Sequence, residues 1–352
     1  MNMHISPRFS DGRPLVLMRA DASRQVGFGH FVRTAALAGY LAGDFDCRIA
    51  TFNADGGHIS DYQRDLVRQA GAMLVDISAA SQVEFDRKFL RLSHSVPLVV
   101  LDNYYYTSEY QAAVKRAAGK LVCIDDVHDR HFVSDVVMTF CPLRREDFSL
   151  EPETLFYGGL EWSFLRDSFL LGVPPRRQWP VRRIVTAMGG ADPFRLTDKI
   201  LRVVRSVAPD VGVDVVAGPT VEVSETTDAG CSGAAGEIRV WRSLDASQMS
   251  SLLDSADLGI FPASTVCVEA FSRRLPVAAG HYVGNQKEFF EHGVCNNWFY
   301  PLGSFLDSEA ALGRRLSAML SLPAPPCAPQ IDFVKRRADI IEIFKTLVRN
   351  GE

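Results

Sequence analysis

The sequence has 352 residues, of which 47% are hydrophobic and 23% charged, and a formal net charge of −4 at pH 7. This is the composition of a globular chain long enough for two domains, and its slightly acidic balance does not favour nucleic acid or an anionic membrane as the main partner. Seven scattered cysteines without a Cys-x-x-Cys pair argue against a disulfide framework and a structural zinc site. No stretch approaches 18 uninterrupted apolar residues and the first 13 residues lack a signal-peptide core, so we expect a reduced, cytoplasmic protein without membrane insertion.

The first predicted strand, residues 15–18, is followed by a glycine-bearing loop and a helix-like segment at residues 34–41. Residues 19–33 read R-A-D-A-S-R-Q-V-G-F-G-H-F-V-R. Such loops bind phosphorylated ligands in α/β folds, because backbone N–H groups and the helix dipole point at them. The third glycine of a dinucleotide fingerprint would fall at Val32, and a histidine, His30, occupies the helix mouth. The loop therefore predicts chemistry at a nucleotide-sugar site and not hydride transfer.

Near-continuous apolar runs alternate with helix-like segments through the rest of the first half. Strands that are apolar along their whole length are typical of a parallel sheet covered on both faces. The further strands expected here are residues 48–52, 73–77, 97–102, 121–124 and 136–140, with helices that include 59–70 and 108–118.

A proline- and charge-rich segment, residues 173–180, is the predicted linker, and the alternation restarts after it. We expect an N-terminal domain at 1–172, a C-terminal domain at 181–329, and a C-terminal helical segment at 330–352 that packs back on the first domain. The second-half strands are expected at 184–188, 213–217, 238–241, 258–261 and 276–279, with helices at 195–207 and 331–349. The chain is thus predicted to be α/β, with two Rossmann-like domains that face each other across a ligand-binding cleft.

Seven segments, in fixed order, resemble a known family. They are residues 19–33, 101–104, 124–126, 165–169, 189–193, 264–269 and 285–286. On these segments the chain resembles the UDP-2,4-diacetamido-2,4,6-trideoxy-β-L-altropyranose hydrolases of pseudaminic acid biosynthesis. Those hydrolases share the two-domain GT-B architecture, and they look like the lipid-linked N-acetylglucosaminyl transferase of peptidoglycan synthesis. The chain departs from the family at Val268 (often Trp), at Ala263 (usually Gly) and at Asp167-Ser168 (usually Pro-Glu), which bears on the identity of the sugar.

The resemblance implies that His30 is the general base and that Tyr104 faces the substrate beside it. A neutral imidazole near pH 7 suits the removal of a proton from an attacking water. The alternatives are a histidine that only caps or packs at the helix start, and a tyrosine that packs with Tyr105 and Tyr106.

Ligand-binding residues are expected in both halves. In the first domain, the glycines permit close approach of the backbone, Asp21 holds either a sugar hydroxyl or its own loop, and Arg166 reaches the substrate. In the second domain, the glycine pair wraps the diphosphate, and Ser264, Thr265 and the ribose-binding Glu269 hold UDP. Asn285 is expected to bind the sugar or phosphate or to cap a helix. The full set of expected ligand-binding residues is Asp21, Gly27, Gly29, Arg33, Arg166, Gly189, Gly190, Ser264, Thr265, Glu269, Asn285 and Gln286.

Two successive carboxylates, Asp125 and Asp126, would suit a metal, but no further ligands accompany them, so we expect no metal, no cofactor and one loop-bracing aspartate. The resulting prediction is a hydrolase that cleaves the anomeric C–O bond of a UDP-linked (di)acetamido-6-deoxy sugar with inversion, for nonulosonic acids of surface glycans. We expect it to be a monomer or weak dimer. One alternative is a GT-B glycosyltransferase that uses a UDP-sugar and a hydroxyl acceptor. A third hypothesis is a non-catalytic nucleotide-sugar sensor.

Overall fold

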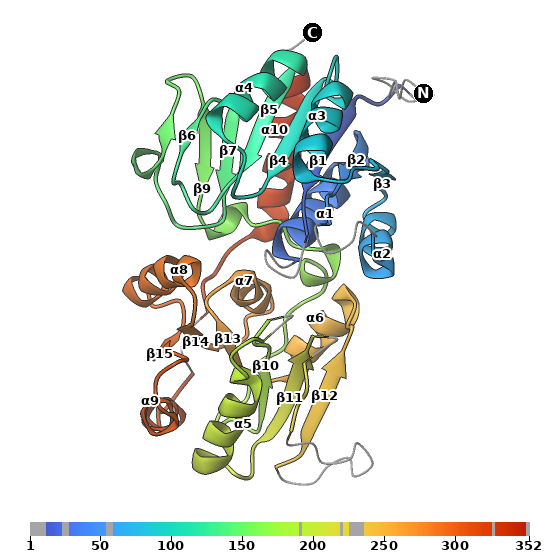
Figure 1. Cartoon of the computed structure of the whole chain (residues 1–352). Coiled ribbons are helices and arrows are strands. Elements are labelled where there is room, and N and C mark those ends of the chain that lie inside the picture. Colours follow the sequence, from blue (N-terminus) through green and yellow to red (C-terminus); the bar gives the residue numbers. More distant parts are fainter. Residues whose placement is uncertain are drawn as a thin grey trace. The chain divides into compact units, whose positions relative to one another are not determined.

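The computed structural model describes residues 12–22, 28–53, 59–189, 192–218, 221–224, 236–325 and 328–349. The chain divides into two compact units, one formed by Met1–Arg166 with Asp332–Glu352 and the other by Asp167–Ile331. Each unit contains one large parallel sheet with helices against it (Figure 1).

The first unit is built on a seven-stranded sheet with strand order β3-β2-β1-β4-β5-β7-β9. Every neighbouring pair in it is parallel. Its strands are β1 (Leu15–Ala20), β2 (Asp46–Ala50), β3 (Met73–Val75), β4 (Leu98–Asp102), β5 (Lys120–Ile124), β7 (Val136–Thr139) and β9 (Leu155–Gly158). Every residue of β1, β4 and β7 is buried, as their apolar sequences predict. Two short strands, β6 (His131–Phe132) and β8 (Ser149–Leu150), pair separately.

Five α-helices belong to the first unit in the described residues. They are α1 (Gly29–Leu41), α2 (Asp61–Gln69), α3 (Gln82–Leu92), α4 (Ser108–Ala117) and α10 (Phe333–Arg349), with short 3-10 helices η1 (Arg145–Asp147) and η2 (Leu160–Trp162). The chain returns to this unit at its C-terminal end, where α10 packs on α1 and η2. Lys345 of α10 pairs with Asp44 at 2.7 Å, and the guanidinium of Arg337 lies 4.9 Å from the ring centre of Tyr40.

The second unit repeats the plan with a six-stranded parallel sheet, in the order β12-β11-β10-β13-β14-β15. Its strands are β10 (Arg183–Thr186), β11 (Gly212–Ala217), β12 (Ile238–Arg242), β13 (Leu258–Pro262), β14 (Val277–His281) and β15 (Tyr300–Ser304). Its helices are α5 (Leu196–Val207), α6 (Ala246–Ser255), α7 (Thr265–Ser272), α8 (Gly284–Cys295), α9 (Glu309–Leu320) and the 3-10 helix η3 (Asp167–Phe169). One apolar cluster joins α5 and α9 to one face of this sheet.

The boundary between the units falls after Arg166, six residues before the predicted domain end at 172, and the predicted linker belongs to the second unit. Specific contacts hold this segment there. Ser250 Oγ of α6 donates to the carbonyl of Ser168 at 2.8 Å. Arg177 Nη1 donates to the carbonyls of Leu253, Asp254 and Ala256 at 2.8–3.0 Å. Composition alone indicated a linker because these partners lie about 75 residues or more away in sequence.

The predicted strands are found within a few residues of their expected positions. The expected strand at 48–52 is shifted to Asp46–Ala50, and the expected helix at 59–70 begins only at Asp61. That start is set by a capping box, in which the Ser60 side chain accepts from the Gln63 N–H and the Gln63 side chain accepts from the Ser60 N–H. Sequence patterning placed no strand at the edge strands β9 and β15, in which a single residue, Leu302, is fully buried.

Candidate active site

The predicted base, His30, lies in the first turn of α1. The sheet register sets Ala20 of β1 beside Asp102, and Asp102 beside Ile124 of β5. The carboxyl ends of these three strands therefore share one edge of the sheet. This edge is where ligands bind in parallel α/β folds.

The imidazole of His30 is buried and paired with a carboxylate. Its Nδ1 lies 2.7 Å from Oδ1 of Asp102, at the end of β4. A carboxylate at this distance assigns the ring proton to Nδ1 and leaves the lone pair on Nε2. Arg33 Nη2 also lies 3.0 Å from Nδ1, but both groups donate in this tautomer, so its proton goes to Asp102 Oδ1 at 2.5 Å. His30 is thus arranged as a proton acceptor with a fixed orientation.

Asp102 is fully buried and accepts from three side chains. Besides His30, it accepts from Arg33 Nε at 2.8 Å and from Thr34 Oγ1 at 2.8 Å, both through Oδ2. Burial alone would raise the pKa of Asp102, but the charge of Arg33 and then that of His30, with their hydrogen bonds, lower it to about 2. Asp102 is therefore an ionised anchor that orients the imidazole.

Two further side chains complete this cluster. The ring of Tyr104 meets that of His30 edge to face, with centroids 4.3 Å apart, which brings together the two residues predicted to be catalytic. Arg33 Nη1 donates to Asp126 Oδ2 at 3.1 Å. All three nitrogens of Arg33 donate to Asp102 and Asp126, so the structure shows Arg33 positioning these carboxylates. Its contact with ligand stays a prediction.

Of the alternatives left open for Asp21, the structure favours the loop-bracing one. Its carboxylate accepts from the Phe52 N–H at 2.8 Å, from Arg19 Nη2 at 2.9 Å and from the Tyr105 hydroxyl. Gly29 is exposed at the start of α1, and an added Cβ there would meet nothing within 4 Å. Gly27 lies outside the described residues.

In the second unit, the predicted diphosphate residues follow β10 and β13. Gly189 has φ +104°, a conformation that favours glycine, and a Cβ there would lie 3.3 Å from the Tyr282 hydroxyl. Gly190 lies outside the described residues. Ser264 immediately precedes α7, yet its side chain does not cap that helix and instead donates to the Pro262 carbonyl at 3.3 Å. Thr265 begins α7.

The helices that carry predicted site residues begin differently from most others in the described residues. Neither α1, α7 nor α8 has a side-chain hydrogen bond at its N-cap. By contrast, α2, α3, α4, α6 and α9 each begin at a Ser, Thr or Asp side chain that accepts from the helix backbone. Helix N-termini without a side-chain cap leave N–H groups for water or a ligand anion.

The remaining predicted ligands have mixed environments. Glu269 is half-buried in the second turn of α7, and Arg166 is half-buried at the end of the first unit. Gln286 is buried and accepts from the Tyr282 N–H at 3.0 Å through Oε1, which fixes the β14–α8 turn. Asn285 belongs to the first turn of α8, and its side chain lies outside the described part of the structure.

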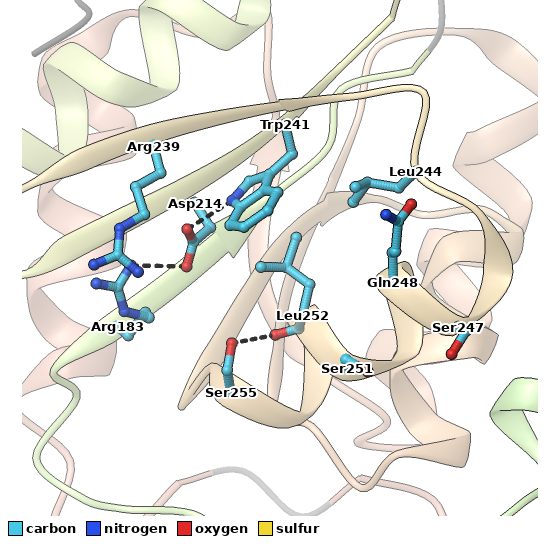
Figure 2. A pocket seen from close by; sticks show the side chains of 10 residues that line it. All are labelled: Arg183, Asp214, Arg239, Trp241, Leu244, Ser247, Gln248, Ser251, Leu252 and Ser255. Atoms are coloured by element: carbon cyan, nitrogen blue, oxygen red, sulfur yellow. Dashed lines mark hydrogen bonds and ion pairs between the residues drawn. The ribbon is translucent and has the colours of Figure 1, made fainter. Parts of the chain in front are cut away.

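A separate hollow of about 440 Å³ lies between α6 and the sheet of the second unit (Figure 2). Each of its charged side chains is paired: Asp214 accepts from Arg183 Nη1 and from Trp241 Nε1, each at 2.8 Å, and Arg239 donates to Glu237 outside the hollow at 2.6 Å. None of the predicted site residues lines it.

The sequence placed Asp102 at the end of the expected strand 97–102 without a role for it, and it did not distinguish Asp126 from Asp125. Asp125 Oδ1 braces its own loop by accepting from the N–H groups of Val127 and His128 at 2.8 and 2.7 Å. The usable signal was the presence of aspartates at the ends of two successive buried strands.

Within the described residues, no three His, Cys, Asp or Glu side chains cluster as a metal site requires. No helix in that part of the chain has both the length and the apolarity to span a membrane.

Comparison of the sequence with known proteins does not identify a family, because no family model matches it. The chain is 22% identical over 310 residues to an uncharacterized protein of Methanocaldococcus jannaschii, a match that covers 82% of this chain and 61% of that protein. The chain thus spans less than two thirds of the length of this relative.

Several glycosyltransferases are among the solved structures that this chain resembles. The glycotransferase of kitacinnamycin matches with a TM-score of 0.56 and 13% identity over 98% of both chains. MurG of Acinetobacter baumannii matches at 0.59 and 12%, over 96% of this chain and 99% of its own. Anabaena HepE, solved with UDP-glucose, matches at 0.55 and 12%, over 94% and 99%. The prediction of an α/β chain with two Rossmann-like domains is confirmed, and its fold is that of GT-B glycosyltransferases.

Proposed function

We propose that this chain cleaves the bond between the anomeric carbon of a UDP-sugar and UDP, and passes the sugar to a hydroxyl acceptor. The observation that carries this proposal is the buried pair of His30 Nδ1 and Asp102 Oδ1, 2.7 Å apart, at the ligand-binding edge of the first sheet. The fold is that of sugar-transferring enzymes, which supports a hydroxyl acceptor.

In this proposal the acceptor hydroxyl gives its proton to Nε2 of His30 as its oxygen attacks the anomeric carbon. The carbon–oxygen bond to UDP breaks at the same time, and UDP leaves with the electron pair. Asp102 holds the ring and stabilises the imidazolium that forms. Attack from the face opposite UDP predicts inversion of the anomeric centre.

The second unit supplies the other half of the chemistry in this proposal. Gly189 and the uncapped start of α7 at Ser264 and Thr265 offer backbone N–H groups to the diphosphate. Fixed N–H dipoles stabilise the charge that develops on the departing UDP. Glu269, one turn along α7, is proposed to accept from the ribose hydroxyls.

A second candidate is hydrolysis, in which water replaces the acceptor hydroxyl. The observation that favours it is the sequence of residues 19–33 and of the later segments, which resembles the hydrolases of pseudaminic acid biosynthesis. In this candidate the substrate is a UDP-linked diacetamido-6-deoxy sugar and the free sugar feeds a nonulosonic acid. His30 has the same task in both reactions.

The deciding experiment is to incubate the protein with a panel of UDP-sugars, first without and then with hydroxyl acceptors. UDP release and the anomeric configuration of the product are followed by NMR. Release that requires an acceptor, with inversion, is the expected result, whereas rapid release into water would establish the hydrolase. UDP binding without release under either condition would overturn both candidates and support a sensor.

A further inference from the structure

The cluster around His30 contains a carboxylate oxygen whose purpose the proposed reaction does not explain. Asp126 Oδ2 accepts from Arg33 Nη1 at 3.1 Å. Its other oxygen, Oδ1, is buried and has no hydrogen-bond partner among the described residues. The side chain as a whole is 11% exposed. Buried polar atoms are nearly always hydrogen-bonded, so an unpaired oxygen in a native protein needs an explanation.

The neighbouring aspartate shows that this is not a general property of the loop after β5. Asp125 Oδ1 accepts from two backbone N–H groups and so closes its own turn. Among the residues that the structure describes, Asp126 makes no such local contact and is held from another element, by an arginine of α1. Its orientation is therefore set by the catalytic cluster and not by its own loop.

A single guanidinium joins Asp126 to the proposed base. Arg33 Nη1 contacts Asp126, and Arg33 Nη2 lies 3.0 Å from His30 Nδ1. The strand register agrees, because Ile124 at the end of β5 pairs with Asp102 at the end of β4. Asp126 and the proposed base are therefore held by one guanidinium at the same edge of the sheet.

The charge of the cluster defines what this oxygen can bind. Asp102 and Asp126 share the one positive charge of Arg33, so the cluster carries an excess negative charge while His30 is neutral. An ionised carboxylate only accepts hydrogen bonds, and excess negative charge repels phosphate. The partner is therefore a hydroxyl or amide N–H donor, which on a UDP-sugar belongs to the sugar ring and not to the diphosphate.

We infer that Asp126 is a specificity-determining residue that accepts a hydrogen bond from one hydroxyl or amide N–H of the sugar, through Oδ1. This inference rests on the proposed function for the identity of the ligand. It assigns sugar selection to the first unit, at the carboxylate that Arg33 Nη1 holds.

The test is a set of displacement titrations with UDP, UDP-glucose, UDP-N-acetylglucosamine and UDP-glucose analogues deoxygenated singly at carbons 2, 3, 4 and 6. Wild-type protein is compared with Asp126→Ala, Asp126→Asn and Asp129→Asn, the last being a control at an exposed neighbour. In the wild type, removal of one hydroxyl should weaken binding about 10- to 100-fold, the range for a hydrogen bond to a charged group. In Asp126→Ala that loss should vanish, while the losses at the other positions persist. The reason is that the free-energy effects of two changes fail to add only where the two changed groups contact each other.

Equal deoxygenation losses in wild type and Asp126→Ala at every position would overturn the inference, as would a loss of affinity for UDP itself as large as that for the UDP-sugars. Asp126→Asn keeps the size of the side chain, and it replaces the alanine variant in this comparison if that variant does not fold. The titrations measure binding and need no turnover, so they test the Asp126 contact independently of the proposed reaction. A protein that binds UDP-sugars in this pattern but never releases UDP would refute the enzyme and retain the contact.

Discussion

The two units carry their predicted site residues in contrasting ways. In the first, the chemistry rests on buried, charged side chains that hold one another: His30, Asp102, Arg33 and Asp126. In the second, it rests on backbone geometry, with Gly189 at positive φ and α7 lacking a side-chain cap. Fixing a single proton acceptor requires a network of partners, whereas binding a diphosphate requires only exposed N–H groups. Under the proposed function, this difference predicts catalysis in the first unit and nucleotide binding in the second.

Substitution of His30 by Gln should produce the largest effect and should separate the two roles. Loss of the proposed general base is expected to lower kcat about 1000-fold, within the range found for such groups. The dissociation constant of UDP should change less than about twofold, because the proposed nucleotide contacts are in the other unit. Steady-state kinetics and calorimetric titration of UDP measure the two quantities. A decrease in kcat of less than about tenfold would show that His30 is not the general base.

The acid stability of the first unit should depend on Asp102. Its pKa is about 2 in the folded protein, against an ordinary value of 3.8. A carboxyl whose pKa is lowered by folding stabilises the protein fully above its unfolded pKa, and this contribution is lost as the pH falls through the folded pKa. The difference corresponds to about 2 kcal/mol of unfolding free energy lost between about pH 4 and pH 2.

Urea unfolding of the wild type and of Asp102→Asn between pH 2 and pH 7 tests this. The variant should show a weaker dependence on pH in the acid range. At pH 7 it should be less stable by about 3 kcal/mol, because the buried Arg33 loses its main counter-charge. The exposed Asp129→Asn is the control and should follow the wild type. Parallel acid curves for the wild type and Asp102→Asn would contradict the assignment.

The smallest expected effects come from substituting the residues that precede α9 and α7. The first of these residues stabilises the fold, and the second is proposed to bind ligand. Ser308 Oγ accepts from the Ala311 N–H at the start of α9, whereas Ser264 makes no capping bond to α7. Ser308→Ala should therefore cost about 1 kcal/mol of unfolding free energy, and Ser264→Ala less than about 0.5 kcal/mol. Ser264→Ala should weaken UDP binding about 10-fold, the lower end of the range for a hydrogen bond to a charged group such as a diphosphate. Weaker UDP binding in Ser308→Ala than in Ser264→Ala would break the comparison.

Local patterning was sufficient for most of the secondary structure. Apolar runs such as 15–18 and 97–102 became buried parallel strands, because only burial on both faces of a sheet accommodates them. The alternation of strands and helices determined the fold class, and His30 was correctly placed at a helix start. The β10 and β13 loops carry the residues expected of a diphosphate site, although their contact with UDP stays a prediction.

The sequence by itself thus determined the α/β class, the strands and the candidate base, since these depend on residues close together in the chain. Only the tertiary structure decided which charges meet. Asp102 and Asp126 lie 69 and 93 residues from Arg33, and parallel pairing of β1, β4 and β5 brings them to one sheet edge. That pairing made Arg33 an anchor for two carboxylates, a role that the sequence did not predict. It also left one oxygen of Asp126 unpaired, because the position of a buried hydrogen-bond partner depends on packing and not on local sequence.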